Sequence, residues 1–185
     1  MSRMVMILGA GGHARVLADV LRLQGSRLVG MTSNDDDVLG RYSPEEIDLV
    51  NGVGSIGVPL KRRELFERFK SRGYRFTSVI HPSAILGSDV SLGEGVQIMA
   101  GVIIQPGTAL GDNTLLNTRV SVDHDCVIGS HVHLAPGVIL CGGVTVEEGC
   151  HVGTGAVVVQ GVRIGKNTFV RARKLVSPSK KPVTP

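Results

Sequence analysis

The sequence has few aromatic residues, no Trp and no long hydrophobic run. Aromatic residues make up 3% of the 185 residues. No stretch approaches the ~18 apolar residues of a membrane-spanning helix, so we expect no membrane association. The 3 cysteines are an odd number without CxxC spacing, which argues against a disulfide framework and a zinc knuckle. The amino terminus has no cleavable signal sequence, and we expect a cytoplasmic protein.

The charge distribution argues against a nucleic-acid partner. The net charge is +4, but residues 83–170 hold 3 Lys/Arg against 7 Asp/Glu, a net charge of −4. That segment offers a single aromatic ring, Phe169, for stacking on bases. Nucleic-acid binders combine a basic stripe with stacking aromatics, and this segment has neither.

A six-residue repeat covers the second half of the chain. Steps of six from Leu86 to Val170 meet an aliphatic residue at all fifteen positions. The column two places earlier contains only small or β-branched residues. A period of six predicts short parallel strands joined by tight turns, three to a coil of eighteen residues, with the aliphatic side chains stacked inward. The low aromatic content fits this interior, since large rings do not fit a narrow core.

The first eighty residues predict an α/β unit. An apolar run over 4–8 meets a glycine-rich turn and then an amphipathic helix that stops at Gly25. Further strands are expected over 28–31 and 76–80, and a second helix over 61–72. The residues expected on the buried helix faces are Val16, Leu17, Val20, Leu21 and Leu23, then Leu65, Phe66 and Phe69.

The glycine-rich turn fits a phosphate-binding pattern. Gly9, Gly11 and Ala14 match G-x-G-x-x-G/A, whose backbone amides approach a pyrophosphate at the start of a helix. The alternative is a tight turn that binds nothing. A full dinucleotide fold needs two βαβ halves, and eighty residues hold about one, so a nucleoside diphosphate fits better than a nicotinamide cofactor.

Two groups of histidines are candidates for chemistry. His124 shares a column with Gly142, one coil along, where a missing side chain is expected to leave a slot for a thioester and a free amide for an oxyanion. His133 is expected to stack on His151, between Leu115 and Phe169. Half a coil separates His124 from His133, so the two are expected to meet only between subunits.

His124 suits general-base catalysis of acyl transfer. Its ordinary pKa is near neutrality, and a neighbouring carboxylate, Asp125 or Asp123, would orient the ring and stabilise its charged form. The alternative is a solvated turn in which a histidine happens to lie beside two acids.

Both halves together resemble the NeuD/PglD-like sugar O- and N-acyltransferases. The motifs that carry the likeness are Gly9-Ala10-Gly11-Gly12-His13, His81-Pro82-Ser83-Ala84, Asn117-Thr118, Val122-Asp123-His124-Asp125 and Val127-Ile128-Gly129. The resemblance covers roughly 4–170 and implies a left-handed parallel β-helix. It divides the chain into a Rossmann-like nucleotide-sugar-binding domain (1–82), a β-helix acyltransferase domain (83–172) and a basic tail (173–185).

The resemblance also implies roles for single residues. His124 would be the general base and Asp125 its positioning acid. The acceptor sugar nucleotide would contact Gly11, Gly12, His13, Ser33, Asn34, Gly54 and Asn117. Acetyl-CoA would contact His133, Thr154 and Ala172. The family forms homotrimers with active sites between subunits and uses no metal.

Three features depart from the family pattern. Its two acids after the second strand are either displaced here or replaced by Ser33 and Asn34. Its glycine-rich last coil with a G-x-P-A segment is replaced by a basic, Pro-containing end. Asp125 is one methylene shorter than the Glu of some relatives.

The sequence therefore predicts an acetyl-CoA-dependent N-acetyltransferase acting on the 4-amino group of a nucleotide-linked amino-dideoxy sugar. The main alternative is a sialic acid-type sugar O-acetyltransferase. A zinc enzyme of the γ-carbonic anhydrase type and a non-catalytic β-helix scaffold stay open as further alternatives. The identity of the nucleotide and of the sugar is left open.

Overall fold

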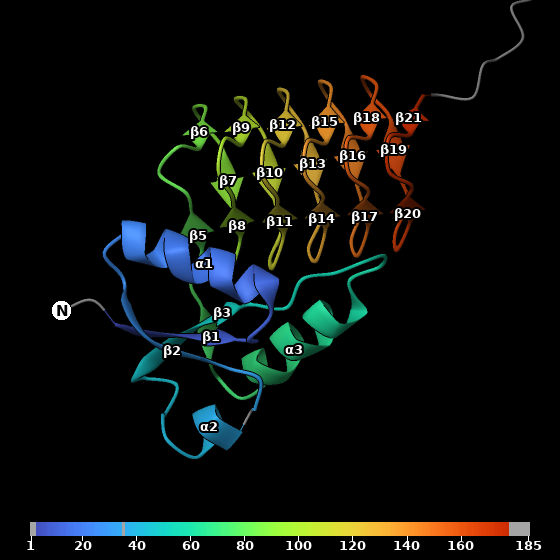
Figure 1. Cartoon of the computed structure of the whole chain (residues 1–185). Coiled ribbons are helices and arrows are strands. Elements are labelled where there is room, and N and C mark those ends of the chain that lie inside the picture. The colour runs from blue at the N-terminus through green and yellow to red at the C-terminus, as the bar shows by residue number, and fades with distance from the viewer. Residues whose placement is uncertain (1–2, 35, 178–185) are drawn as a thin grey trace, which may run out of the picture.

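A computed structural model describes residues 3–34 and 36–177 (Figure 1). A small α/β unit comes first and a left-handed parallel β-helix follows it. The helices are α1 (Gly12–Leu23), α2 (Asp36–Leu39) and α3 (Leu60–Lys70), and the strands of the unit are β1 (Met4–Leu8), β2 (Arg27–Thr32), β3 (Ile47–Asn51) and β4 (Arg75–Phe76). Within the described ranges, no helix has the length and apolar character needed to cross a membrane.

The α/β unit is a parallel sheet of order β2-β1-β3-β4. Burial of α1 differs from the prediction at two positions. Leu17, Val20 and Leu21 are buried as expected, but Val16 and Leu23 are 48% and 63% exposed. The small residues Ala14 and Ala18 take their place in the contact, because α1 packs closely against the β-helix as well as against β1.

Two other features differ from the sequence prediction. The expected strand over 76–80 is two strands in different sheets, since β4 (Arg75–Phe76) pairs with β3 while β5 (Val79–Ile80) pairs with a strand of the β-helix. The chain passes from one sheet to the other at Thr77 and Ser78. Phe76 and Val79 are therefore buried in two different hydrophobic clusters. Strand β3 was not anticipated.

The β-helix has three parallel sheets, each built from two-residue strands. The first sheet contains β5 (Val79–Ile80), β8 (Gln97–Ile98), β11 (Leu115–Leu116), β14 (His133–Leu134), β17 (His151–Val152) and β20 (Phe169–Val170). The second contains β6 (Ile85–Leu86), β9 (Ile103–Ile104), β12 (Ser121–Val122), β15 (Ile139–Leu140), β18 (Val157–Val158) and β21 (Leu175–Val176). The third contains β7 (Ser91–Leu92), β10 (Ala109–Leu110), β13 (Val127–Ile128), β16 (Thr145–Val146) and β19 (Arg163–Ile164).

The register confirms the eighteen-residue coil. Leu116 lies beside Leu134 in the next coil, and the aliphatic column and its β-branched partner fill one continuous core. The same register continues one hexad beyond each end of the predicted repeat, to Ile80 and Val176. The α/β unit packs on the first sheet, through contacts such as that of α1 with Met99 and Leu115 (Figure 1). A cleft is left where the two parts meet.

Candidate functional site

The cleft between the α/β unit and the first sheet has a volume of about 530 Å³. Two loops of the α/β unit and three residues of the β-helix form its walls. The lining residues are Gly9, Ala10, Gly11, Gly12, His13, Gly52, Val53, Gly54, Ser55, Ile56, Leu115, Asn117 and His133. Five of the residues predicted to contact the acceptor are thus brought together: Gly11, Gly12, His13, Gly54 and Asn117.

Glycine is required where the two loops meet. Gly9 has φ +121°, and a Cβ there would lie 3.0 Å from the carbonyl carbon of Gly52. A Cβ on Gly52 would lie 2.5 Å from Ile7 Cγ2. These contacts bring the start of α1 close to the end of β3. The N-cap residue of α1 is Gly11, so no side chain caps the first amide groups of the helix, and the first turn of α1 contains no acidic residue. Its amide groups are therefore suited to bind an anionic group in the cleft.

His13 is held neutral at the edge of the cleft. Its Nε2 lies 2.8 Å from Gln97 Oε1 on the first sheet. Burial, together with the charge of Arg62, lowers the pKa of His13 to about 4, although the Gln97 hydrogen bond opposes the shift. At neutral pH the ring is a hydrogen-bonding group and carries no charge.

His133 belongs to the same cleft. It stacks on His151 as predicted, with ring centroids 4.6 Å apart, and its Nδ1 lies 2.6 Å from Ser55 Oγ. Asn117 Nδ2 lies 3.4 Å from its other ring nitrogen. Burial, then the neighbouring His151 and Arg62, lowers the pKa of His133 to about 3. The resemblance implied a contact with acetyl-CoA, but the structure places His133 among the residues predicted to bind the acceptor.

Ser33 and Asn34 lie outside the lining of the cleft. Both are exposed after the end of β2, where the Asn34 amide donates to Thr32 Oγ1. Thr32 Oγ1 in turn donates to Asp37 Oδ2 at 2.6 Å. The next residue, Asp35, lies outside the described ranges.

His124 lies at a different corner of the β-helix, between the second and third sheets. Its Nδ1 lies 2.8 Å from Asp125 Oδ2, and its backbone amide donates to Asp123 Oδ1 at 2.9 Å. The hydrogen bond to Asp125 and the charge of Asp123 raise the pKa of His124. The ring is exposed and is a stronger base than an unperturbed histidine.

Gly142 supports the His124 ring. A Cβ on Gly142 would lie 2.7 Å from both Cε1 and Nε2 of the ring, so only glycine allows this position. The expectation of an open slot for the thioester over Gly142 is wrong, because the ring itself covers that space. The Gly142 amide donates to no acceptor within the described part of the chain. The glycine, Asp125 and the ring form one unit, called the His124 corner below.

The other predicted acetyl-CoA contacts lie on the corner between the first and second sheets. Thr154 and Ala172 occupy equivalent positions in successive coils, and both are exposed. Asn117 and Thr118 lie on the same corner two coils earlier. Of the basic tail predicted over 173–185, residues 178–185 lie outside the described ranges. Across residues 3–34 and 36–177, no group of three His, Cys, Asp or Glu side chains is arranged to hold a metal ion.

Three residues of the cleft region were missed by sequence reasoning. Arg62 was not recognised as buried, although it lies three and four residues before the buried Leu65 and Phe66, a spacing that puts it on the same helix face. Gln97 takes the outward position of its hexad, the column that also holds His133 and His151. Ser55 carried no signal in the sequence.

Comparison with known proteins agrees with this architecture. Residues 4–69 match the model of the PglD N-terminal domain. The structure is similar to PerB from Caulobacter crescentus, solved with CoA and GDP-perosamine, at 36% identity and a TM-score of 0.80, covering 93% of this chain and 87% of that one. It is also similar to the acetyltransferase domain of PglB from Neisseria gonorrhoeae, solved with acetyl coenzyme A, at 29% identity and a TM-score of 0.85, covering 93% of this chain and 89% of that one.

WeeI from Acinetobacter baumannii shares the fold at 21% identity, with a TM-score of 0.74 and coverage of 97% of this chain and 93% of that one. The relative at 36% identity matches nearly the whole chain and most of its own length. Together with the cleft, the β-helix and the matched amino-terminal domain, this similarity places the chain: it belongs to the NeuD/PglD-like family of sugar acetyltransferases.

Proposed function

We propose that the protein transfers the acetyl group of acetyl-CoA to the 4-amino group of a nucleotide-linked amino-dideoxy sugar. The observation that carries the proposal is the His124 corner, an exposed base hydrogen-bonded to Asp125, in a chain whose helix α1 also begins without a side-chain cap or an acid at the cleft. PerB, the relative at 36% identity, was solved with CoA, the thiol that acetyl transfer releases, and with GDP-perosamine, a nucleotide-linked sugar.

The cleft binds the acceptor. The first-turn amides of α1 hold the diphosphate, with Gly11 and Gly12 allowing its close approach. His133 and Asn117 belong to the β-helix wall of the cleft, and His13 of α1 contacts that wall through Gln97. All three bind the sugar through neutral hydrogen-bonding groups. Ser33 and Asn34 follow the end of β2, where the nucleoside of a bound nucleotide extends in related α/β folds.

His124 performs the proton transfer. It takes a proton from the attacking amine while the nitrogen forms a bond to the thioester carbonyl carbon. The carbon–sulfur bond then breaks, the CoA thiolate leaves, and it recovers a proton. Asp125 keeps the ring oriented and stabilises its charged form, as the orienting acid of a catalytic triad does. The free Gly142 amide is the proposed donor to the oxyanion.

The active site forms between subunits of a homotrimer. The His124 corner and the cleft lie on different corners of the β-helix, so one chain supplies the base and a neighbour supplies the bound acceptor. The second sheet presents an outward aliphatic column suited to this contact, in which Ile85, Ile103, Ile139 and Leu175 are 61%, 36%, 43% and 60% exposed. Acetyl-CoA lies along the corner that carries Thr154 and Ala172. A cytoplasmic location is part of the proposal.

Release of CoA thiol from acetyl-CoA tests the proposal. The acceptor panel contains UDP-, GDP- and dTDP-linked 4-amino sugars, with free sialic acid as the hydroxyl acceptor. Turnover with one of the amino sugars supports N-acetylation and identifies the nucleotide. Activity on sialic acid alone would replace the proposal with O-acetylation, and silence on every acceptor would contradict both.

A further inference from the structure

Arg62 is a buried cation that the fold does not neutralise. It lies in the first turn of α3 and is 1% exposed. Its Nη1 donates to the carbonyls of Asn51 and Val53 at 2.9 and 3.1 Å, and its Nε donates to the Asn113 carbonyl at 3.4 Å. Its Nη2 is buried and has no hydrogen-bond partner among the residues that the structure describes.

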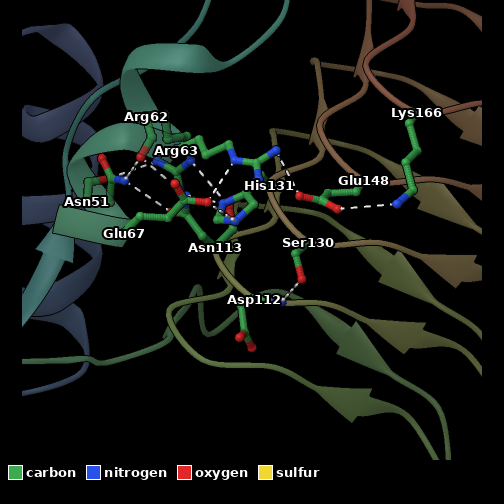
Figure 2. Close-up of polar contacts among 10 residues, drawn as sticks. All are labelled: Asn51, Arg62, Arg63, Glu67, Asp112, Asn113, Ser130, His131, Glu148 and Lys166. Atoms are coloured by element: carbon green, nitrogen blue, oxygen red, sulfur yellow. Dashed lines mark hydrogen bonds and ion pairs between the residues drawn. The ribbon is translucent and has the colours of Figure 1, made fainter. Parts of the chain in front are cut away.

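Other arginines of the α/β unit differ from Arg62 because they pair with carboxylates. Arg63, the next residue, pairs with Glu67 at 2.7 Å and with Glu148 at 2.8 Å, as Figure 2 shows. Arg3 lies 2.9 Å from Asp48 Oδ1. Arg62 has no carboxylate partner among residues 3–34 and 36–177, and all its acceptors are backbone carbonyls (Figure 2).

A buried charge without a counter-ion is costly. Burial lowers the pKa of the Arg62 guanidinium to about 9, which reflects how poorly its surroundings stabilise the charge. A guanidinium whose acceptors are all backbone carbonyls keeps an uncompensated buried charge, which is destabilising in itself. The charge is therefore expected to interact with an anion that the protein binds.

The backbone connects Arg62 to the cleft. The Val53 carbonyl points to Nη1, and in a trans peptide the N–H points the opposite way, so the Gly54 amide is directed away from Arg62. Gly54 lines the cleft, and its amide donates to no acceptor in the described part of the chain. Arg62 also borders an adjoining hollow of about 420 Å³ that shares Gly54, Ser55 and Ile56 with the cleft.

We propose that Arg62 is a specificity-determining residue for anionic acceptors, which supplies the buried positive charge opposite the diphosphate and orients the Gly54 amide toward it. This inference rests on the proposed function, because it names the group that favours a nucleotide-linked sugar over a free one. Arg62 acts through its field and through the 53–54 peptide, so it is a positioning residue. The same field lowers the pKa of His13 and of His133.

The test compares the affinity for a nucleoside diphosphate with that for the same nucleoside. The probes are GDP, UDP and dTDP with guanosine, uridine and thymidine, and the dissociation constants come from calorimetry and competition. Replacing Arg62→Met should lower the diphosphate-to-nucleoside affinity ratio by about tenfold or more, since a unit charge at this depth acts through a low effective dielectric. A merely structural residue would weaken both ligands equally and leave the ratio unchanged.

Arg63→Met is the matched control, because it removes a neighbouring cation that already has two carboxylate partners. Its ratio should stay within about twofold of wild type. Asn113→Asp keeps Arg62 and adds a carboxylate on a residue whose carbonyl accepts from Arg62 Nε. It should lower the ratio as Arg62→Met does, so the inference stays testable if Arg62→Met does not fold.

The outcomes separate the inference from the proposed function. Wild-type protein that binds none of the three diphosphates would contradict the proposed function and the inference with it. Tight diphosphate binding by wild type, with an unchanged ratio in a folded Arg62→Met or Asn113→Asp variant, would overturn the inference alone. A fall of the ratio in these variants but not in Arg63→Met supports it.

Discussion

The His124 corner and the cleft use the same side chain in opposite ways. His124 is exposed and lies between two aspartates, which raise its pKa. His13 of α1 is half-buried and His133 of the first sheet is buried, both where the α/β unit meets the β-helix, and their pKa values fall to about 4 and about 3. The corner therefore holds a base that can take a proton, whereas the cleft holds neutral groups that can only donate or accept hydrogen bonds. Position relative to the α/β unit, and not residue type, therefore sets whether the pKa of a histidine is raised or lowered.

The largest expected effect is at the corner. His124→Ala should lower kcat by about 10² or more, because His124 is the proposed general base for the amine. The dissociation constant of acetyl-CoA should stay near the wild-type value. Near-normal kcat in this variant would show that His124 is not the general base. The proposed division between a catalytic corner and a binding cleft would then be wrong.

Gly142→Ala should reduce kcat by about tenfold without loss of folding. The added methyl would lie 2.7 Å from the His124 ring, which must then move away from its position over the coil. Gly165→Ala is the control, because a Cβ there meets no atom within 4 Å. Equal kcat values for the two variants would contradict the role of Gly142 as the support of the ring.

His133→Ala should weaken acceptor binding about tenfold and leave the acetyl-CoA dissociation constant unchanged. Its Nδ1 lies 2.6 Å from Ser55 Oγ in the cleft, and the half-buried Ser55 and Asn117 would each lose a hydrogen-bond partner. His151→Ala serves as the control, since His151 stacks on His133 without lining the cleft. A selective loss of acetyl-CoA affinity would instead reinstate the role that the family resemblance implies.

Asp125→Asn should move the acid limb of the kcat/KM profile to lower pH. The Asp125 hydrogen bond is the main cause of the raised pKa of His124, so removing the charge lowers that pKa toward its ordinary value of 6.5. The base then stays deprotonated to lower pH but is weaker, and kcat on the plateau should fall severalfold. Asp89→Asn is the control, since Asp89 has the same left-handed backbone two coils earlier with Ser88 in place of the histidine. If the acid limb of the kcat/KM profile did not move in Asp125→Asn, Asp125 would not be the cause of the raised pKa of the base.

The smallest expected effect concerns stability. In the folded protein the pKa values of His13 and His133 lie below the ordinary 6.5, so the unfolded chain binds more protons below that pH. The free energy of unfolding should therefore fall as the pH drops from about 6.5 to about 4. His133→Gln should show a smaller fall between these pH values in urea titrations, because one such group has been removed. A fall as steep as in wild type would show that His133 is not held neutral.

The sequence predicted the β-helix well because every position in it has a periodic environment. Leu116, Leu134 and the other inward residues recur every six positions, and the histidine stack of His133 on His151 follows from the eighteen-residue coil alone. The raised pKa of His124 also depends only on neighbours in the sequence, Asp123 and Asp125.

The contact between the two parts of the chain could not be predicted in the same way. Arg62 meets Asn113 fifty-one residues away, and His13 meets Gln97 eighty-four residues away. No local pattern specifies which face of the β-helix covers the α/β unit. The role of His133 was expected from resemblance, and its place in the cleft became apparent only from the loop that carries Ser55.

The most direct test of the account asks whether the corner of one chain serves the cleft of another. His124→Asn disables the corner, and Gly11→Asp disables the cleft by placing a negative charge at a position where a Cβ meets no atom within 4 Å. Each variant should be inactive alone. After the two are unfolded and refolded together, random assortment into trimers should restore about one quarter of wild-type activity, since one site in four combines an intact corner with an intact cleft. A mixture that stays inactive, although mixed trimers form, would show that both regions must come from the same chain and would contradict the account.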